Sequence, residues 1–105
     1  MNIKFAARIA AQSNHKQHHH AAILVRAGSI VGVGYNHNWR HAEVVAMGKV
    51  WPNKRSGLCL WSFRFLKSGE LGMAKPCPAC QKALKESGVL NIHYSTPTGM
   101  ERMKL

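Results

Sequence analysis

Residues 21–35 read Ala-Ala-Ile-Leu-Val-Arg-Ala-Gly-Ser-Ile-Val-Gly-Val-Gly-Tyr. Two apolar β-type runs, 21–26 and 30–35, are separated by turn-forming residues at 27–29. Strand-like runs joined by a short glycine-containing turn are typical of a β-hairpin. We therefore expect two neighbouring strands here, around which the other elements assemble.

Helix-like and strand-like segments alternate after this hairpin, and one helix-like segment precedes it. Apolar residues recur at helical spacing over 2–12, a helical pattern runs from 41 to 51, and a third helix is expected from 76 to 87. β-type runs occupy 58–65 and 89–95, and the residues after a turn at 96–99 are a candidate short edge strand. The order α-β-β-α-β-α-β predicts an α/β fold, a sheet with helices packed on its faces.

The composition favours one domain, residues 1–105, in a reducing compartment. The chain has 105 residues, of which 46% are hydrophobic, enough for a single core. No run approaches the roughly 20 apolar residues of a membrane span, and the N-terminus lacks a secretory pattern. Three cysteines without a signal peptide argue against a disulfide framework. We expect a cytoplasmic protein that does not enter membranes.

The charge balance points to an anionic partner. Fifteen Lys and Arg face four acidic residues, so the formal net charge is +11. Such a surplus attracts polyanions and says nothing about the fold. Nucleic acid, nucleotides and an anionic partner surface are the candidates.

Two short fragments carry the candidate chemistry. His41-Ala42-Glu43 opens the second expected helix, and Pro76-Cys77-Pro78-Ala79-Cys80 opens the third. A catalytic zinc takes three protein ligands from His and Cys and leaves a fourth position for water. His41, Cys77 and Cys80 fill that count, and Glu43 remains as a carboxylate that can move protons. This pairing is a known signature of zinc-dependent nucleobase deaminases.

On these residues the chain resembles the cytidine and deoxycytidylate deaminase superfamily over roughly residues 20–95. Gly34-Tyr35-Asn36 and the final Tyr94-Ser95 also carry the likeness. The resemblance implies a three-layer α/β/α fold, Zn²⁺ as cofactor, and hydrolytic release of ammonia from the amino-bearing ring carbon. It further implies that Asn36 contacts the sugar, and that the backbone around Ala42 and Pro76 helps hold the base.

Departures from the family concern the substrate and the assembly. The loop before Pro76 is longer than in compact relatives, and Lys75 stands where the tRNA adenosine deaminases carry Glu. A C-terminal helix found in many relatives has no room here. Relatives often assemble, so a homo-oligomer stays open.

Several residues also have plainer interpretations. Cys77 and Cys80 alone could form a redox pair, which leaves His41 and Glu43 unexplained. A structural zinc would need a fourth ligand, with Cys59 or a histidine as candidates. Asn36 could be a turn residue. The histidine-rich segment 15–20 is interpreted as a solvated connection whose last members enter a strand, with His15 and Lys16 as weak candidates for phosphate contact.

Trp39 and Arg40 precede His41 and suit base stacking and phosphate contact, although Trp39 could equally pack under its loop. The family pattern favours cytosine over adenine or guanine. A first ligand that is His is what nucleotide and polynucleotide deaminases tend to carry. Three readings stay open: deamination of cytosine in single-stranded nucleic acid, which the net charge favours, deamination of a free nucleotide such as deoxycytidylate, and a basic nucleic-acid-binding module with a zinc site and no turnover.

Overall fold

A mixed β-sheet with helices on both faces forms the molecule. The computed structural model describes residues 1–14, 18–37, 41–50, 53 and 55–105. Its elements follow the order α1 (Ile3–Ala10), β1 (His18–Arg26), β2 (Ser29–Tyr35), α2 (Ala42–Met47), β3 (Leu58–Leu66), β4 (Leu71–Gly72), α3 (Pro78–Glu86), β5 (Val89–Thr96) and β6 (Gly99–Lys104). The expected order is confirmed, including the strand at the C-terminus, and β4 is the one described element that was not predicted.

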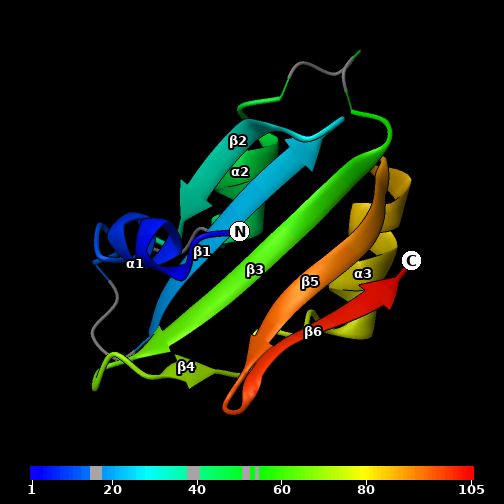
Figure 1. Ribbon diagram of the computed structural model, residues 1–105. Coiled ribbons are helices and arrows are strands. Elements are labelled where there is room, and N and C mark those ends of the chain that lie inside the picture. The colour runs from blue at the N-terminus through cyan, green and yellow to red at the C-terminus, as the bar shows by residue number, and fades with distance from the viewer. Residues whose placement is uncertain (15–17, 38–40, 51–52, 54) are drawn as a thin grey trace.

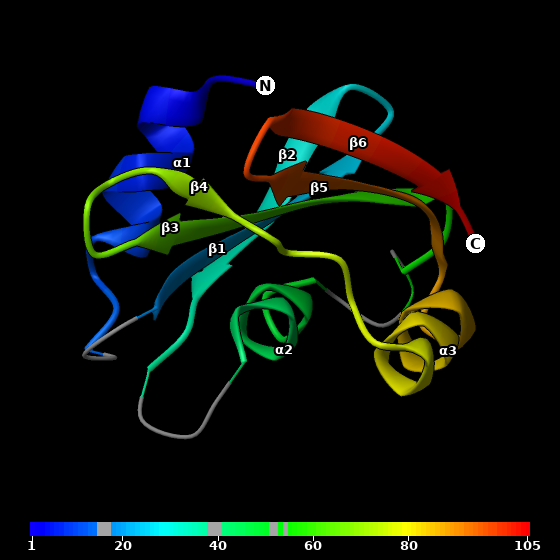
Figure 2. The same cartoon turned by 90° about the horizontal axis from the view of Figure 1, so that it is seen from below.

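The strands lie in the order β2-β1-β3-β5-β6, and β4 pairs with the end of β3. Only β3 and β5 are parallel, and α3 makes the connection between them. Figure 1 shows α1 in front of the sheet, and Figure 2 shows α2 and α3 together on the opposite face. The predicted three-layer α/β/α arrangement is therefore confirmed.

The β1–β2 hairpin closes through two residues. Arg26 pairs with Ser29, so Ala27 and Gly28 form the loop. Both have positive φ angles, 51° and 79°. Two consecutive residues with positive φ are what a type I′ turn requires, and its twist matches that of the strands it joins. The prediction of a turn at 27–29 is thus confirmed, and the observed loop is one residue shorter because Ser29 already belongs to β2.

Alternating side chains of β3 supply both cores. Leu58 and Leu60 belong to the core between the sheet and the helices α2 and α3. Phe63 and Phe65 belong to the core under α1, and Trp61 packs against that cluster. Successive residues of a strand point to opposite faces, so one strand can fill two cores.

Two glycines of β2 let the backbone of α2 rest directly on the strand. A Cβ atom at Gly34 would lie 2.5 Å from the Ala42 carbonyl oxygen and 2.5 Å from the Ala46 nitrogen. At Gly32 it would lie 2.7 Å from the Ala46 carbonyl oxygen. Only residues without a side chain permit this approach. The contact fixes where α2 begins, and hence where Glu43 stands.

Helix boundaries differ from the predicted ones for local reasons. α2 ends at Met47, after which Lys49 and Val50 donate hydrogen bonds three residues back, a tighter turn than an α-helix. The predicted end at residue 51 lies outside the described residues. α3 begins at Pro78, two residues later than predicted, because a residue that precedes proline avoids the helical region. Cys77 accordingly has φ −67° and ψ 161°.

Strand boundaries differ as well. β1 begins at His18, so the last three histidines of the His-rich segment enter the strand as expected. β4 falls inside the predicted loop 67–75. Its two residues pair with Arg64 and Phe65, and so short a strand carries no periodicity that a sequence could reveal. Among the described residues, no helix is long and apolar enough to cross a membrane.

We predict that Gly34→Ala lowers the free energy of unfolding by about 1–3 kcal/mol, because the added methyl group forces α2 away from β2. The measurement is a urea unfolding curve followed by circular dichroism. Gly48→Ala is the matched control, since a Cβ there meets only ordinary contacts of 3.5 Å and its φ of −63° suits alanine. Equal midpoints for the Gly34 and Gly48 variants would contradict the close-packing argument.

Candidate metal centre

The two cysteines meet at the N-terminus of α3. Cys77 is the N-cap and Cys80 lies in the first turn. Their sulfurs are 3.2 Å apart, and both residues are exposed. Pro78 at the first helical position fixes the backbone between them, since its ring already holds a helical φ. The spacing of three residues therefore brings both sulfurs to one point, as predicted.

The local environment separates the two thiols chemically. The backbone N–H of Cys80, followed by its side chain, lowers the pKa of Cys77. The hydrogen bond with Cys77 raises the pKa of Cys80, helped by burial and by the charges of Cys77 and Glu43. Cys77 is thus the first to become a thiolate, which is the form that binds a metal and acts as a nucleophile.

Glu43 of α2 is held by a hydrogen bond to the sheet. It lies in the first turn of that helix and is half-buried. The Ser62 hydroxyl, from β3, donates a hydrogen bond of 3.3 Å to Glu43 Oε1. The effect of Glu43 on the pKa of Cys80 places the carboxylate within electrostatic reach of α3. One hydrogen bond therefore ties the Glu43 carboxylate of α2 to the centre of the sheet.

His41 is the N-cap of α2. Its side chain is exposed, and its carbonyl oxygen accepts a hydrogen bond of 3.2 Å from the Val45 N–H. Within the described ranges, no three His, Cys, Asp or Glu side chains are close enough together to hold a metal ion. The structure thus brings Cys77 and Cys80 together, and the roles of His41 as third ligand and of Glu43 beside the metal stay predictions.

The donor chemistry at this place fits zinc. Two zinc–sulfur bonds of about 2.3 Å at a tetrahedral angle place the sulfurs about 3.8 Å apart. The observed separation of 3.2 Å needs only a small side-chain adjustment to reach that value. Cys77 and Cys80 would supply the sulfur ligands, His41 the nitrogen ligand, and Glu43 a carboxylate that need not bind the metal.

Asn36 makes two hydrogen bonds to the backbone of β1. Its Oδ1 accepts from the His20 N–H at 2.8 Å, and its Nδ2 donates to the His18 carbonyl oxygen at 3.0 Å. The side chain thereby continues the β1–β2 ladder past the end of β2. One N–H and one oxygen lone pair of the amide remain for other partners, so its predicted contact with a sugar stays a prediction.

The remaining predicted substrate-binding residues are placed unevenly. The side chain of Ala42 is buried beneath β2, with its carbonyl oxygen close to Gly34. Pro76 is half-buried, and its carbonyl oxygen accepts a hydrogen bond of 2.8 Å from Gln81 Nε2. Trp39 and Arg40, like His15 and Lys16, lie outside the described residues.

Two residues of β3 near the site were missing from the sequence prediction. Ser62, which holds Glu43, is only 1% exposed. Arg64 is next on the same face; its Nη2 lies 2.8 Å from His18 Nδ1, and its Nε is buried and has no hydrogen-bond partner among the described residues. The signal for both was available: the alternation of β3 places these polar residues on the face of Leu58 and Leu60.

Cys59 does not approach the pair. It lies between Leu58 and Leu60 on β3, so its side chain points to the face of α1. Burial raises the pKa of this thiol, against a smaller opposite effect of Arg102. Cys59 is therefore not placed to act as a fourth ligand for a metal bound by Cys77 and Cys80.

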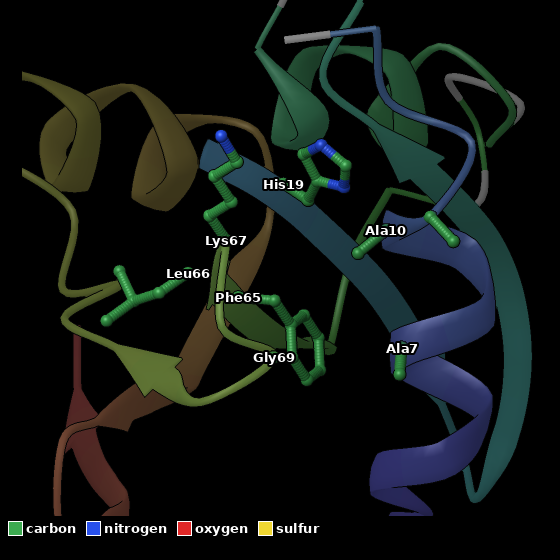
Figure 3. A pocket seen from close by; sticks show the side chains of 8 residues that line it. Ala7, Ala10, His19, Phe65, Leu66, Lys67 and Gly69 are labelled. Atoms are coloured by element: carbon green, nitrogen blue, oxygen red, sulfur yellow. The ribbon is translucent and has the colours of Figure 1, made fainter. Parts of the chain in front are cut away.

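A hollow of about 270 Å³ lies elsewhere in the molecule, between α1 and the end of β3. Figure 3 shows Ala7 and Ala10 on one side of it and Phe65, Leu66 and Lys67 on the other. Neither Glu43 nor the cysteines line it. Its walls are mainly alanine, phenylalanine and leucine side chains, with the polar side chains of His19 and Lys67 at its border.

Comparisons with known proteins agree with this geometry. A family model described as the cytidine and deoxycytidylate deaminase zinc-binding region matches residues 2–96. No curated protein sequence matches the chain. Among solved structures, RibD of Acinetobacter baumannii (form 2) has a TM-score of 0.64 at 16% identity, over 93% of this chain and 29% of that one.

A second solved structure is of similar size to this chain. A cytidine deaminase of Mycobacterium tuberculosis with a Glu-to-Gln substitution has a TM-score of 0.60 at 18% identity, over 97% of this chain and 91% of that one. At such identities both likenesses show the fold alone. This chain spans less than a third of RibD.

We predict that the protein binds one zinc ion, and that Cys80→Ala and His41→Ala each lower the bound fraction, because each removes a ligand. Native mass spectrometry of protein mixed with a small molar excess of zinc measures the fraction of molecules that carry the metal. Cys59→Ala is the control, since its thiol lies on the other face of the sheet. Zinc retained by Cys80→Ala at the wild-type level would show that the metal is held elsewhere.

Proposed function

Because the chain belongs to the cytidine and deoxycytidylate deaminase zinc-binding family, we propose that it is a zinc-dependent hydrolytic deaminase that converts cytosine to uracil in single-stranded nucleic acid. The observation that carries the proposal is the 3.2 Å approach of the Cys77 and Cys80 sulfurs at the N-terminus of α3, together with the Glu43 carboxylate that Ser62 holds on α2. Two thiols and a carboxylate that is left over suit hydrolysis better than a purely structural site.

The roles of the residues follow from their chemistry. Zinc, when bound by His41, Cys77 and Cys80, supplies the Lewis acidity that makes water a nucleophile at neutral pH. Glu43 accepts a proton from the attacking water and delivers it to the departing amino group. Water adds oxygen to the ring carbon, the carbon–nitrogen bond breaks, and ammonia and uracil are the products.

Ser62 is a positioning residue in this scheme. Its hydroxyl donates to one oxygen of Glu43, and the buried position of Ser62 in the central strand keeps that donor fixed. The other carboxylate oxygen is left to exchange the proton. A base held at one oxygen loses less freedom when the substrate binds, which favours reaction.

The choice of a polymeric substrate rests on charge. A net charge of +11 on 105 residues far exceeds what one phosphate group needs. Contacts to several phosphates are the main source of affinity for single strands. Deamination of free deoxycytidylate is the alternative, and the family description includes it. A binding module without turnover would leave the positioned carboxylate of Glu43 without a purpose.

We predict that Glu43→Gln lowers kcat about 10²–10⁴-fold while zinc stays bound, because the amide cannot carry the proton. Ser62→Ala should lower kcat about two- to tenfold and leave KM unchanged, since it removes one hydrogen bond to the carboxylate. Steady-state deamination of cytidine, with zinc content and unfolding midpoint measured on each variant, checks this. An active Glu43→Gln enzyme would refute the mechanism.

The substrate is decided by competition. Zinc-loaded protein receives deoxycytidylate, cytidine and a cytosine-containing single-stranded oligonucleotide together, and mass spectrometry reads each product. We expect the oligonucleotide to be converted fastest, with a rate that falls as salt rises, because salt weakens phosphate contacts. Conversion of deoxycytidylate alone would make this a free-nucleotide enzyme. No conversion by the zinc-loaded protein would favour a different base or the binding module.

A further inference from the structure

Part of the sheet face that carries α1 has no helix over it in the described part of the chain. Figure 1 shows α1 over the β1 and β2 side, while β5 and β6 lie open beside it. Trp61 of β3 and His93 of β5 pair in register and point to this open face. Both are half-buried, and Arg102 of β6 is the cross-strand neighbour of His93.

The rings of Trp61 and His93 form one aromatic stack. Their ring centroids are 3.8 Å apart and their planes differ by 3°. Burial lowers the pKa of His93, and the nearby guanidinium of Arg102 lowers it further. The imidazole is therefore neutral at physiological pH and stacks as an uncharged ring. Arg102, which also acts on Cys59, places its positive charge beside this stack.

Basic side chains lie beside the stack of Trp61 and His93, and acidic side chains do not. Arg102 and Lys104 are exposed and alternate along β6, so both point to this face, and Lys104 pairs with Asn91. The four acidic residues of the chain lie elsewhere. Glu101 bonds Tyr94 in the core of the other face, Glu43 and Glu86 belong to α2 and α3, and Glu70 lies in the turn before β4.

We propose that this strip, made of Trp61, Asn91, His93, Arg102 and Lys104, is a second binding surface that holds single-stranded nucleic acid. A base extends the ready-made stack of Trp61 and His93, since every base has a π-face that suits an aromatic platform. Arg102 and Lys104 contact phosphates on either side of that base. Asn91 offers an amide for a base edge, with its Oδ1 within 3.4 Å of Arg102 Nη2.

Charge selects this occupant over a second copy of the chain. Two copies that meet through this strip would bring Arg102 and Lys104 together with their own counterparts, without an acidic residue to offset them. A polyanion instead releases counterions when it meets such a surface. The strip lies across the sheet from Cys77 and Cys80, so it holds a strand at a distance from the site of deamination.

The test uses an oligothymidylate of about 12 nucleotides, within the range of single-strand binding sites. It contains no cytosine, so its binding does not depend on turnover. Fluorescence anisotropy gives Kd for the wild-type protein and for Arg102→Gln/Lys104→Gln. The control Lys82→Gln/Lys85→Gln removes the same charge from exposed positions of α3.

We expect the strip variant to raise Kd about tenfold, and to make the salt dependence shallower by about 0.7 per lost phosphate contact. The α3 control should change Kd much less. Trp61→Phe, which keeps an aromatic ring at this position, should lower the tryptophan quenching caused by the oligonucleotide, and the quenching that is left comes from Trp39 and Trp51. Cytidine turnover of the strip variant should equal that of the wild type.

Three results would overturn the proposal: no binding of oligothymidylate by the wild type, equal losses in the two double variants, or quenching that is as large in Trp61→Phe as in the wild type. An inactive wild type that binds oligothymidylate through the strip would refute the proposed deamination and leave this inference standing. An active wild type whose strip variant binds oligothymidylate normally would refute this inference and leave the proposed deamination standing.

Discussion

The close contact between β2 and α2 is the constraint on which the rest of the molecule depends. Gly32 and Gly34 have no Cβ atom, so the backbone of α2 can lie directly against the strand. That approach sets the depth of Glu43, which then reaches Ser62 in the middle of the sheet. Burial of a carboxylate is costly unless a donor meets it, so helix position and hydrogen bond must be correct together.

The sheet also explains why two distant segments meet. β3 and β5 are parallel, so the chain must cross back between them, and α3 is that crossover. Parallel strands require such a connection, and its helix packs on one face. The cysteines at the N-terminus of α3 therefore lie on the same face of the sheet as α2 and Glu43 because of topology.

Much of this was predictable from the sequence. Hydrophobic pattern and turn residues predicted the order of the elements, and the Cys77–Cys80 spacing predicted their meeting. β4 could not be predicted, because a two-residue strand is defined by its partner β3. Ser62 and Arg64 were missed because their role depends on which strand lies beneath which helix. The start of α3 was misplaced because Pro76 and Pro78 both suit a helix start.

Strand β3 carries Ser62 for one face and Trp61 for the other, at adjacent positions of the chain. A slip of one residue in its pairing would therefore exchange them, driving an indole under α2 and sending the hydroxyl to solvent. Natural selection should thus tolerate insertions and deletions between residues 58 and 66 far less than those in the turn around Gly69. The pairing register of β3 sets the side chains on both faces of the sheet, so a change that shifts this register alters both faces together.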